Sequence, residues 1–266
     1  MTLRLLDLNI WNYNDPWPVR RDLIVELIRE TRVDVVALQE IQYLSWLEDA
    51  RHQAAQIHAH FPGFDMIWHP AYYWEPGWGE NLGEKWEGLA ILSRHPIVDQ
   101  RFRQLTRRPL ADARPWLRGV LGAQIRSPGG PFWLFDTHRS GNRTYAVPEV
   151  LDFVTGPAAG KPFALTGDFN VTPDSTDIRF LTGQTQIDGQ RGNLIDAWAA
   201  VHPEESGETV ESWGAKPGQR IDYVLVSPDV NVVDIQIVGD RPNPEGVYPS
   251  DHLGLLADLR MAESAT

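Results

Sequence analysis

Apolar and polar positions near the N-terminus switch from a strand-like to a helix-like pattern and back. Residues 4–10 form a short apolar run that predicts a buried strand. Pro18 stands where a first helical turn would begin, and apolar residues then recur at helical spacing up to Arg32. Residues 33–38 are a β-branched run that stops at Gln39-Glu40. The pattern therefore predicts a strand, a helix and a second buried strand in succession.

The rest of the chain consists mainly of short apolar runs bounded by turn residues. Further strands are predicted at residues 64–68, 88–93, 98–105, 117–125, 132–137, 162–166, 221–226, 230–238 and 253–259. Helices are predicted at 47–60 and 145–153. The turn at 128–131 joins the strands on either side of it as a hairpin. Residues 69–86 mix aromatic side chains with prolines and glycines, which predicts a long loop.

Strands dominate this pattern, helices are interspersed, and hairpins occur beside at least one crossover unit. Two mixed β-sheets packed face to face, with helices outside, satisfy these features. We therefore predict an α/β fold, a four-layer α/β sandwich. Because no linker, low-complexity tract or internal repeat divides the 266 residues, we expect 1–266 to form a single domain.

Composition limits the chemistry and the location. The chain has no cysteine, so a bound metal must take oxygen or imidazole ligands. Residues 1–9 resemble a strand more than a signal peptide, and no apolar run is long enough to cross a bilayer. We therefore expect a soluble, cytoplasmic protein.

The formal net charge of -12 argues against a basic groove for nucleic acid, because proteins that grip DNA by its phosphates use clustered Lys and Arg. It does not exclude a nuclease. A carboxylate-rich site that holds divalent cations attracts a phosphate locally while the remaining surface stays acidic.

Polar motifs follow or precede many of the predicted strands, where a sheet edge exposes them to water, metals and substrates. In chain order they are Asn9, Leu38-Gln39-Glu40, the segment from Glu87 to Arg94, Asp136-Thr137-His138, Gly167-Asp168-Phe169-Asn170, Arg220-Ile221-Asp222-Tyr223 and Ser250-Asp251-His252. This ordered set resembles the motifs of the endonuclease/exonuclease/phosphatase superfamily, which includes DNase I-like, exonuclease III-like and neutral sphingomyelinase-like enzymes. The resemblance spans nearly the whole chain and implies the same sandwich fold. It also implies hydrolysis of a phosphoester with a divalent metal.

Glu40 is the first candidate metal ligand, because a buried strand delivers it to the sheet edge and Mg²⁺ prefers oxygen ligands. Asn9, after the neighbouring strand, either fixes Glu40 or shares the ion. The family pattern makes Asp251 a further ligand or a second carboxylate that orients water. Mg²⁺ is the expected cofactor, and Mn²⁺, which takes the same ligands, is the alternative. Taken alone, Glu40 reads as the start of a surface loop.

Asp168 and Asn170 lie two residues apart, so in an extended segment both side chains point to one face. The alternative is a turn in which they cap their own backbone. The resemblance implies that Asp168 positions the attacking water and that Asn170 binds phosphate.

Two histidines stand within motifs. His252 is the candidate general base or phosphate-stabilising imidazolium, and the resemblance gives it Asp222 as its carboxylate partner. The resemblance also implies a Glu87–His138 pair that protonates the leaving group or steadies the phosphate; the alternative for Glu87 is a salt bridge at the rim. The other six histidines are expected to be exposed and idle: His52, His58, His60, His69, His95 and His202.

Arginines near these motifs are candidates for phosphate binding. Arg118 offers a planar guanidinium at the start of a predicted strand, and Arg114 is its rival. Many relatives continue with Leu after the His138 motif, whereas this chain has cations and amides at 139–143. These residues either contact a substrate phosphate or form a solvated turn.

The predicted loop at 69–86 is aromatic and acidic, unlike the basic loops that follow a DNA backbone. It suits stacking of a ring, docking of an apolar tail or contact with a protein, unless its aromatic side chains fold back onto the core. The sequence therefore favours a smaller phosphodiester or phosphomonoester as substrate. A DNA nuclease of the same superfamily is the alternative, and a non-catalytic scaffold is a third reading.

Overall fold

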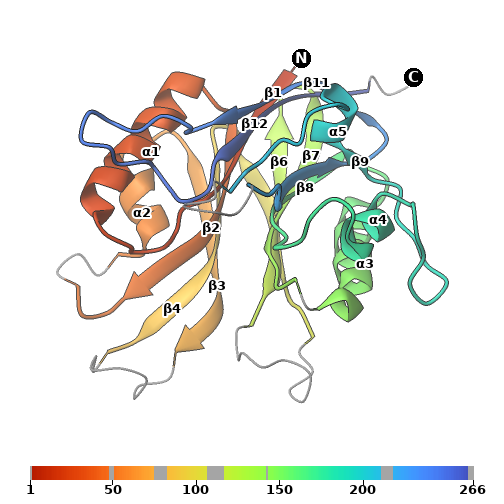
Figure 1. Ribbon diagram of the computed structural model, residues 1–266, viewed down its shortest axis with the longest axis horizontal. Coiled ribbons are helices and arrows are strands. Elements are labelled where there is room, and N and C mark those ends of the chain that lie inside the picture. The colour runs from red at the N-terminus through yellow and green to blue at the C-terminus, as the bar shows by residue number, and fades with distance from the viewer. Residues whose placement is uncertain are drawn as a thin grey trace.

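The computed structural model describes residues 2–47, 51–74, 83–106, 117–141, 143–210 and 218–262, and it shows two six-stranded sheets packed face to face (Figure 1). The first sheet has the order β11-β12-β1-β2-β4-β3 and the second has the order β5-β6-β7-β8-β10-β9. Helices α1 and α2 lie outside the first sheet, and α3 and α4 lie outside the second (Figure 1). The predicted four-layer α/β sandwich is confirmed.

The first sheet joins the two ends of the described chain. Its strands are β1 (Thr2–Asn9), β2 (Val35–Leu44), β3 (Asp65–Trp74), β4 (Lys85–Ser93), β11 (Val230–Val238) and β12 (Gly254–Met261). Only the β1–β2 pair is parallel among these neighbours. Helix α1 (Trp17–Thr31) makes the crossover that a parallel pair requires.

The second sheet repeats this arrangement later in the chain. Its strands are β5 (Ile97–Gln104), β6 (Gly119–Ser127), β7 (Gly130–His138), β8 (Phe163–Asp168), β9 (Ile195–Asp196) and β10 (Asp222–Val226). Here the parallel pair is β7–β8, and the crossover contains the 3-10 turn η1 (Thr144–Ala146) and helix α3 (Val147–Ala158). The remaining helices are α2 (Gln53–His58), α4 (Thr176–Leu181) and α5 (Ala197–Val201).

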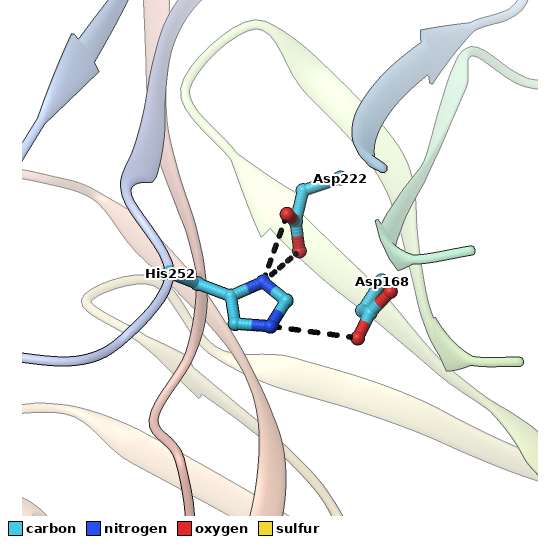
Figure 2. Close-up of side chains that lie close together, drawn as sticks. All are labelled: Asp168, Asp222 and His252. Atoms are coloured by element: carbon cyan, nitrogen blue, oxygen red, sulfur yellow. Dashed lines mark hydrogen bonds and ion pairs between the residues drawn. The ribbon is translucent and has the colours of Figure 1, made fainter. Parts of the chain in front are cut away.

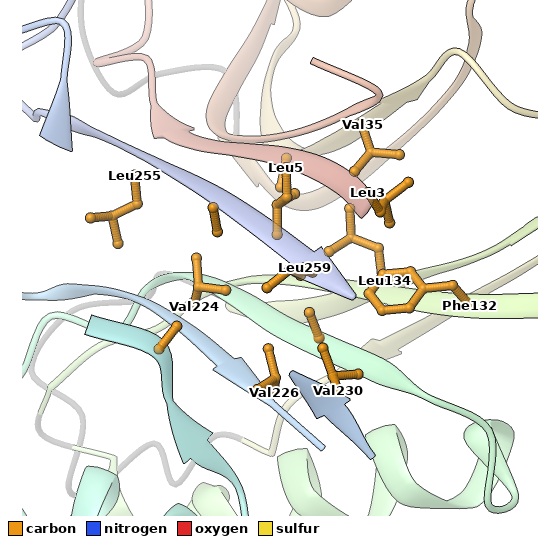
Figure 3. Close-up of a cluster of buried hydrophobic side chains, with 14 of the residues drawn as sticks. Leu3, Leu5, Val35, Phe132, Leu134, Val224, Val226, Val230, Leu255 and Leu259 are labelled. Atoms are coloured by element: carbon orange, nitrogen blue, oxygen red, sulfur yellow. The ribbon is translucent and has the colours of Figure 1, made fainter. Parts of the chain in front are cut away.

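Three hydrophobic clusters hold the four layers together. The central one lies between the sheets, where Leu3 and Leu5 of the first sheet meet Leu134 of the second (Figure 3). The other two lie between each sheet and its own helices. Burial of an aliphatic side chain of this size contributes about 1.5–3 kcal/mol. The alternation along each strand explains the pattern, because successive side chains enter opposite clusters.

The prediction of a long loop at 69–86 is wrong at both ends. Strand β3 continues to Trp74 and β4 begins at Lys85, while 75–82 lie outside the described residues. Aromatic residues favour strands, and the rings of Tyr73 and Trp86 pair across β3 and β4 with centroids 4.6 Å apart. Pro70 is tolerated because β3 is an edge strand and the pairing is irregular at that position.

Other boundaries also differ from the sequence pattern. Helix α2 covers only Gln53–His58 of the predicted 47–60, and β2 passes through Gln39-Glu40 to Leu44. The pairing of β2 with β4 shifts register between Leu38 and Ile41, and Glu40 has φ 58°. A β-bulge therefore sits where the pattern predicted the end of the strand. The short elements α4, α5 and β9 were not predicted.

Candidate active site

The two parallel strand pairs end at the same edge of the sandwich. Asn9 of β1 is in register with Gln39 of β2, and His138 of β7 is in register with Asp168 of β8. Asp222 opens β10 directly opposite Asp168. Strand ends from both sheets therefore bring together residues that are far apart in the sequence.

His252 lies between two carboxylates (Figure 2). Its Nδ1 is 2.9 Å and 3.1 Å from the two carboxylate oxygens of Asp222, and its Nε2 is 3.9 Å from Oδ2 of Asp168. Burial by itself lowers the pKa of His252, but the charges of Asp222, Asp168 and Asp251 outweigh it and raise the pKa to about 10. The ring is therefore an imidazolium at neutral pH, with both nitrogens able to donate.

Thr209 holds the Asp222 carboxylate in place and was not found from the sequence. Its Oγ1 donates to Oδ2 of Asp222 at 2.6 Å and accepts from the backbone N–H groups of Ile221 and Asp222. An isolated bridge between Val210 and His252 brings this segment to the site. No motif surrounds Thr209 in the sequence, so only the fold could reveal it.

Asp168 is the acceptor on which the site converges. Its Oδ2 accepts from Nδ2 of Asn9 at 3.1 Å and lies 3.4 Å from Nε2 of His138. Its Oδ1 accepts from the backbone N–H of Asn170 at 2.8 Å. Burial, followed by the charge of Asp222, raises the pKa of Asp168 to about 7. The carboxylate can therefore take up a proton near neutral pH.

Asn170 does not extend the strand as the two-residue spacing predicted. It has φ 55°, in the left-handed region, and its Nδ2 donates to the carbonyl of Arg139 at 3.0 Å. The segment is a turn in which Asp168 caps the backbone N–H of Asn170. The turn reading of this motif is correct, and it still leaves Asn170 beside the site.

Arg118 separates Glu87 from His138. Its Nη1 donates to Oε1 of Glu87 at 3.1 Å and to Nδ1 of His138 at 2.8 Å. The direct distance from Oε1 of Glu87 to Nδ1 of His138 is longer, 3.9 Å. The expected direct pair is therefore bridged by the arginine. Burial, together with the charges of Arg118 and His252, holds the pKa of His138 well below its usual range. Since a guanidinium only donates, the neutral ring accepts at Nδ1 and carries its proton on Nε2, toward Asp168.

Glu40 and Asp251 form the other side of the site. Oε2 of Glu40 accepts from Nδ2 of Asn12 at 2.8 Å, so Asn12, rather than Asn9, fixes this carboxylate. Burial raises the pKa of Glu40, and the negative charges of Glu87 and Asp251 add to the effect. Burial also raises the pKa of Asp251. Such mutual repulsion among half-buried carboxylates is relieved when a cation binds between them.

The donor set fits a hard divalent ion. Carboxylate oxygens of Glu40 and Asp251 are the ligands that Mg²⁺ prefers, with waters completing its shell. A second group, Asp168, Asp222 and His252, has ligand atoms within 4.8 Å of one another. A metal held there would take a deprotonated ring nitrogen of His252, because metal binding is coupled to loss of the ligand's proton.

A buried polar cluster lies beneath the site. Nε2 of Gln39 donates to Oδ1 of Asp7 at 2.8 Å and to Oδ1 of Asp136 at 2.6 Å, and all three side chains are at most 1% exposed. Burial raises the pKa of both Asp7 and Asp136 well above its usual range. Asp7 and Asp136 each stand inside an apolar run of the sequence, at 4–10 and 132–137. The buried polar cluster that this pattern indicates was not predicted.

Several other expectations need correction. Arg139 is buried and bound to Asp177 at 2.6 Å, so it neither lies in a solvated turn nor faces the site. His52 is not idle, because it stacks on Trp68 and accepts from the N–H of Ala55 at the start of α2. Four other histidines are only partly exposed: His58, His69, His95 and His202. Arg114 and Asn142 lie outside the described residues.

The sequence profile of the endonuclease/exonuclease/phosphatase family matches residues 8–252, which contain every predicted site residue. The chain belongs to this family. Its members hydrolyse phosphoester bonds. None of the described helices combines the length and the apolar composition that a membrane span requires.

Individual relatives are distant. A putative neutral sphingomyelinase from Caenorhabditis elegans is 24% identical over 96% of this chain and 66% of its own length. Nocturnin from Drosophila melanogaster is 25% identical over 92% of this chain and 42% of its own length. This chain thus spans less than two thirds of either relative. The crystal structure of a family member from Bacteroides vulgatus covers 98% of this chain and 99% of its own, with a TM-score of 0.74 and 22% identity, which shows the shared fold.

Proposed function

We propose that this protein is a divalent-metal-dependent hydrolase of a phosphodiester or phosphomonoester smaller than duplex DNA. The observation that carries the proposal is the convergence of two imidazoles on one carboxylate oxygen. Nε2 of His138 and Nε2 of His252 lie 3.4 Å and 3.9 Å from Oδ2 of Asp168. In-line attack of water on phosphorus requires a group that accepts the proton of the water and hydrogen-bond donors that stabilise the charge on the phosphoryl oxygens. Asp168 and the two imidazoles can supply these functions.

In this proposal Asp168 orients the attacking water and accepts its proton. The imidazolium of His252, held by Asp222, donates to a phosphoryl oxygen as charge builds on it. Asn170 contacts the phosphate from the turn that follows Asp168. The new bond joins the water oxygen to phosphorus, and the bond from phosphorus to the leaving oxygen breaks.

On the other side, Arg118 and His138 supply further donors to the phosphate, and Glu87 holds the guanidinium in place. Glu40, Asp251 and Asn9 would hold Mg²⁺, or Mn²⁺ as the alternative. A bound divalent ion neutralises phosphoryl charge and stabilises the leaving oxygen. The net charge of -12 supports a small substrate over a DNA backbone.

A panel of substrates tests the proposal. Rates are measured with Mg²⁺ on bis-p-nitrophenyl phosphate, inositol phosphates, sphingomyelin and plasmid DNA, with His252→Ala as the inactive control. We expect metal-dependent turnover of at least one small ester and slow nicking of plasmid. Fast plasmid nicking with little else cleaved, together with salt-sensitive DNA binding, would make the protein a nuclease instead.

A further inference from the structure

Arg20 of helix α1 is buried, with 1% of its surface exposed, yet its guanidinium bonds to backbone rather than to a carboxylate. Its five N–H groups make six hydrogen bonds, of 2.6–3.2 Å, because Nη2 shares one hydrogen between two acceptors, and each acceptor is a backbone carbonyl oxygen. The carbonyls belong to Ile10, Trp11, Asn12, Asn14 and Pro249. They come from two loops that are more than 200 residues apart in the chain, since the Arg20–Pro249 separation is 229.

The first loop follows β1 and orients Glu40. Trp11 and Asn12 have φ 56° and φ 37°, in the left-handed region that residues with a Cβ seldom adopt. Arg20 stabilises this geometry by donating hydrogen bonds to both of their carbonyl oxygens, at 3.2 Å and 2.6 Å. The same turn aims Nδ2 of Asn12 at Oε2 of Glu40, 2.8 Å away. The guanidinium therefore holds the turn that fixes one candidate metal ligand.

The second loop carries Asp251. The carbonyl of Pro249, 3.2 Å from Nη1 of Arg20, stands two residues before that carboxylate. Ser250 then donates to the carbonyl of Asn9 at 2.6 Å and accepts from the N–H of His252. One guanidinium thus ties the loop that fixes Glu40 to the loop that carries Asp251.

Only arginine can make this connection. Its planar group presents five N–H donors in a fixed fork, whereas lysine presents three on a flexible stem. Burial lowers the pKa of Arg20 to about 10, and the negative charges of Asp251, Glu40 and Asp15 offset part of this effect. Salt-bridging to either ligand would occupy an oxygen that a metal needs, and binding to carbonyls leaves those oxygens available.

We propose that Arg20 is a positioning residue that fixes the separation of Glu40 and Asp251, and thereby the affinity of the site for a divalent cation, without contacting the ion or the substrate. The inference rests on the proposed function. Removal of residues that support metal ligands typically weakens metal binding by about 10–100-fold. Loss of the Arg20 guanidinium should therefore raise the Kd for the metal far more than it changes turnover at saturating metal.

The test measures Mn²⁺ binding by calorimetry and electron paramagnetic resonance, beside kcat at saturating Mn²⁺ and the Tm. Arg20→Lys is expected to raise the Kd for Mn²⁺ by about tenfold or more, with kcat at saturating metal within about threefold of the parent. Arg139→Lys is the matched control, because Arg139 is equally buried and supports the other sheet. It should lower Tm and leave the Kd for Mn²⁺ unchanged.

The possible outcomes distinguish the role of Arg20 from the proposed function of the protein. If the parent protein binds no Mn²⁺, the proposed function fails. If the parent binds it and Arg20→Lys binds it equally well, or if Arg139→Lys weakens binding as much, the role of Arg20 is overturned. Should Arg20→Lys not fold, Asn12→Ala decides: it keeps the guanidinium and releases Glu40, so weaker Mn²⁺ binding supports the connection and parent-like binding refutes it.

Discussion

The two halves of the sandwich share one topological device, a parallel strand pair, and place different side chains at its end. In each, a helical crossover creates a parallel strand pair, β1–β2 in the first sheet and β7–β8 in the second. The first pairing ends at the amides of Asn9 and Gln39, with the carboxylate of Glu40 next along β2, and the second ends at the imidazole of His138 and the carboxylate of Asp168. The topology therefore fixes where side chains meet, and the residues that end the strands decide what they do.

The supporting arginines differ in the same way. Among the described residues, the guanidinium of Arg20 donates to backbone carbonyl oxygens and to no carboxylate. Arg139 in the other half donates to one carbonyl and also forms a salt bridge with Asp177. Under the proposed function, the half that would bind the cation needs its carboxylates left available. The half that would transfer protons has no such need, so its arginine can be neutralised by a local carboxylate.

The largest expected effect comes from the second half. Asp168→Asn keeps the shape of the side chain and removes the proton acceptor, so kcat should fall by about 10²–10⁴-fold. Turnover of bis-p-nitrophenyl phosphate at saturating Mg²⁺ measures it, with circular dichroism to confirm folding. Parent-like turnover in a folded variant would show that Asp168 is not the acceptor.

A paired experiment then separates the halves. Glu40→Gln should raise the Mg²⁺ concentration for half-maximal rate by about 10–100-fold, and excess Mg²⁺ should restore much of the rate. His138→Gln, on the other sheet, should lower kcat without that rescue, because it removes a donor to the phosphate. Titration of the rate with Mg²⁺ is the measurement. Equal rescue of both variants would abolish the distinction between the halves.

The smallest expected effect concerns stability where the halves meet. Burial raises the pKa of Asp136, so the folded state binds a proton that the unfolded state releases above its ordinary pKa, and stability falls as pH rises. Asp136→Asn removes this penalty and should raise the free energy of unfolding at pH 8 by about 1–3 kcal/mol. The gain should shrink toward pH 4. Urea denaturation at several pH values measures it, and a gain independent of pH would contradict this account.

Much of the fold follows from the sequence because buried strands read as uninterrupted apolar runs. The strand at 230–238 was predicted with the bounds that β11 has. The failures have physical causes: aromatic residues with Pro70 suggested a loop where an edge strand tolerates them, and the bulge at Glu40 looked like a strand end. The short helices α4 and α5 span too few turns to show a periodicity.

The candidate site was predictable in position more than in detail. Strand ends and the family resemblance selected the residues that the structure brings together, from Asn9 to His252. The contacts that set their states depend on long-range geometry. Thr209 on Asp222 and Arg118 between Glu87 and His138 have no pattern in the sequence.

The cluster of Gln39 with Asp7 and Asp136 has a mechanical consequence. Hydrophobic contacts between the two sheets are non-directional, so they resist separation of the sheets but tolerate sliding. A hydrogen bond weakens steeply once its angle is lost. The amide of Gln39 holds a carboxyl group from its own sheet and another from the facing sheet. It therefore resists sliding of one sheet past the other, close to the strand ends that carry the candidate site residues.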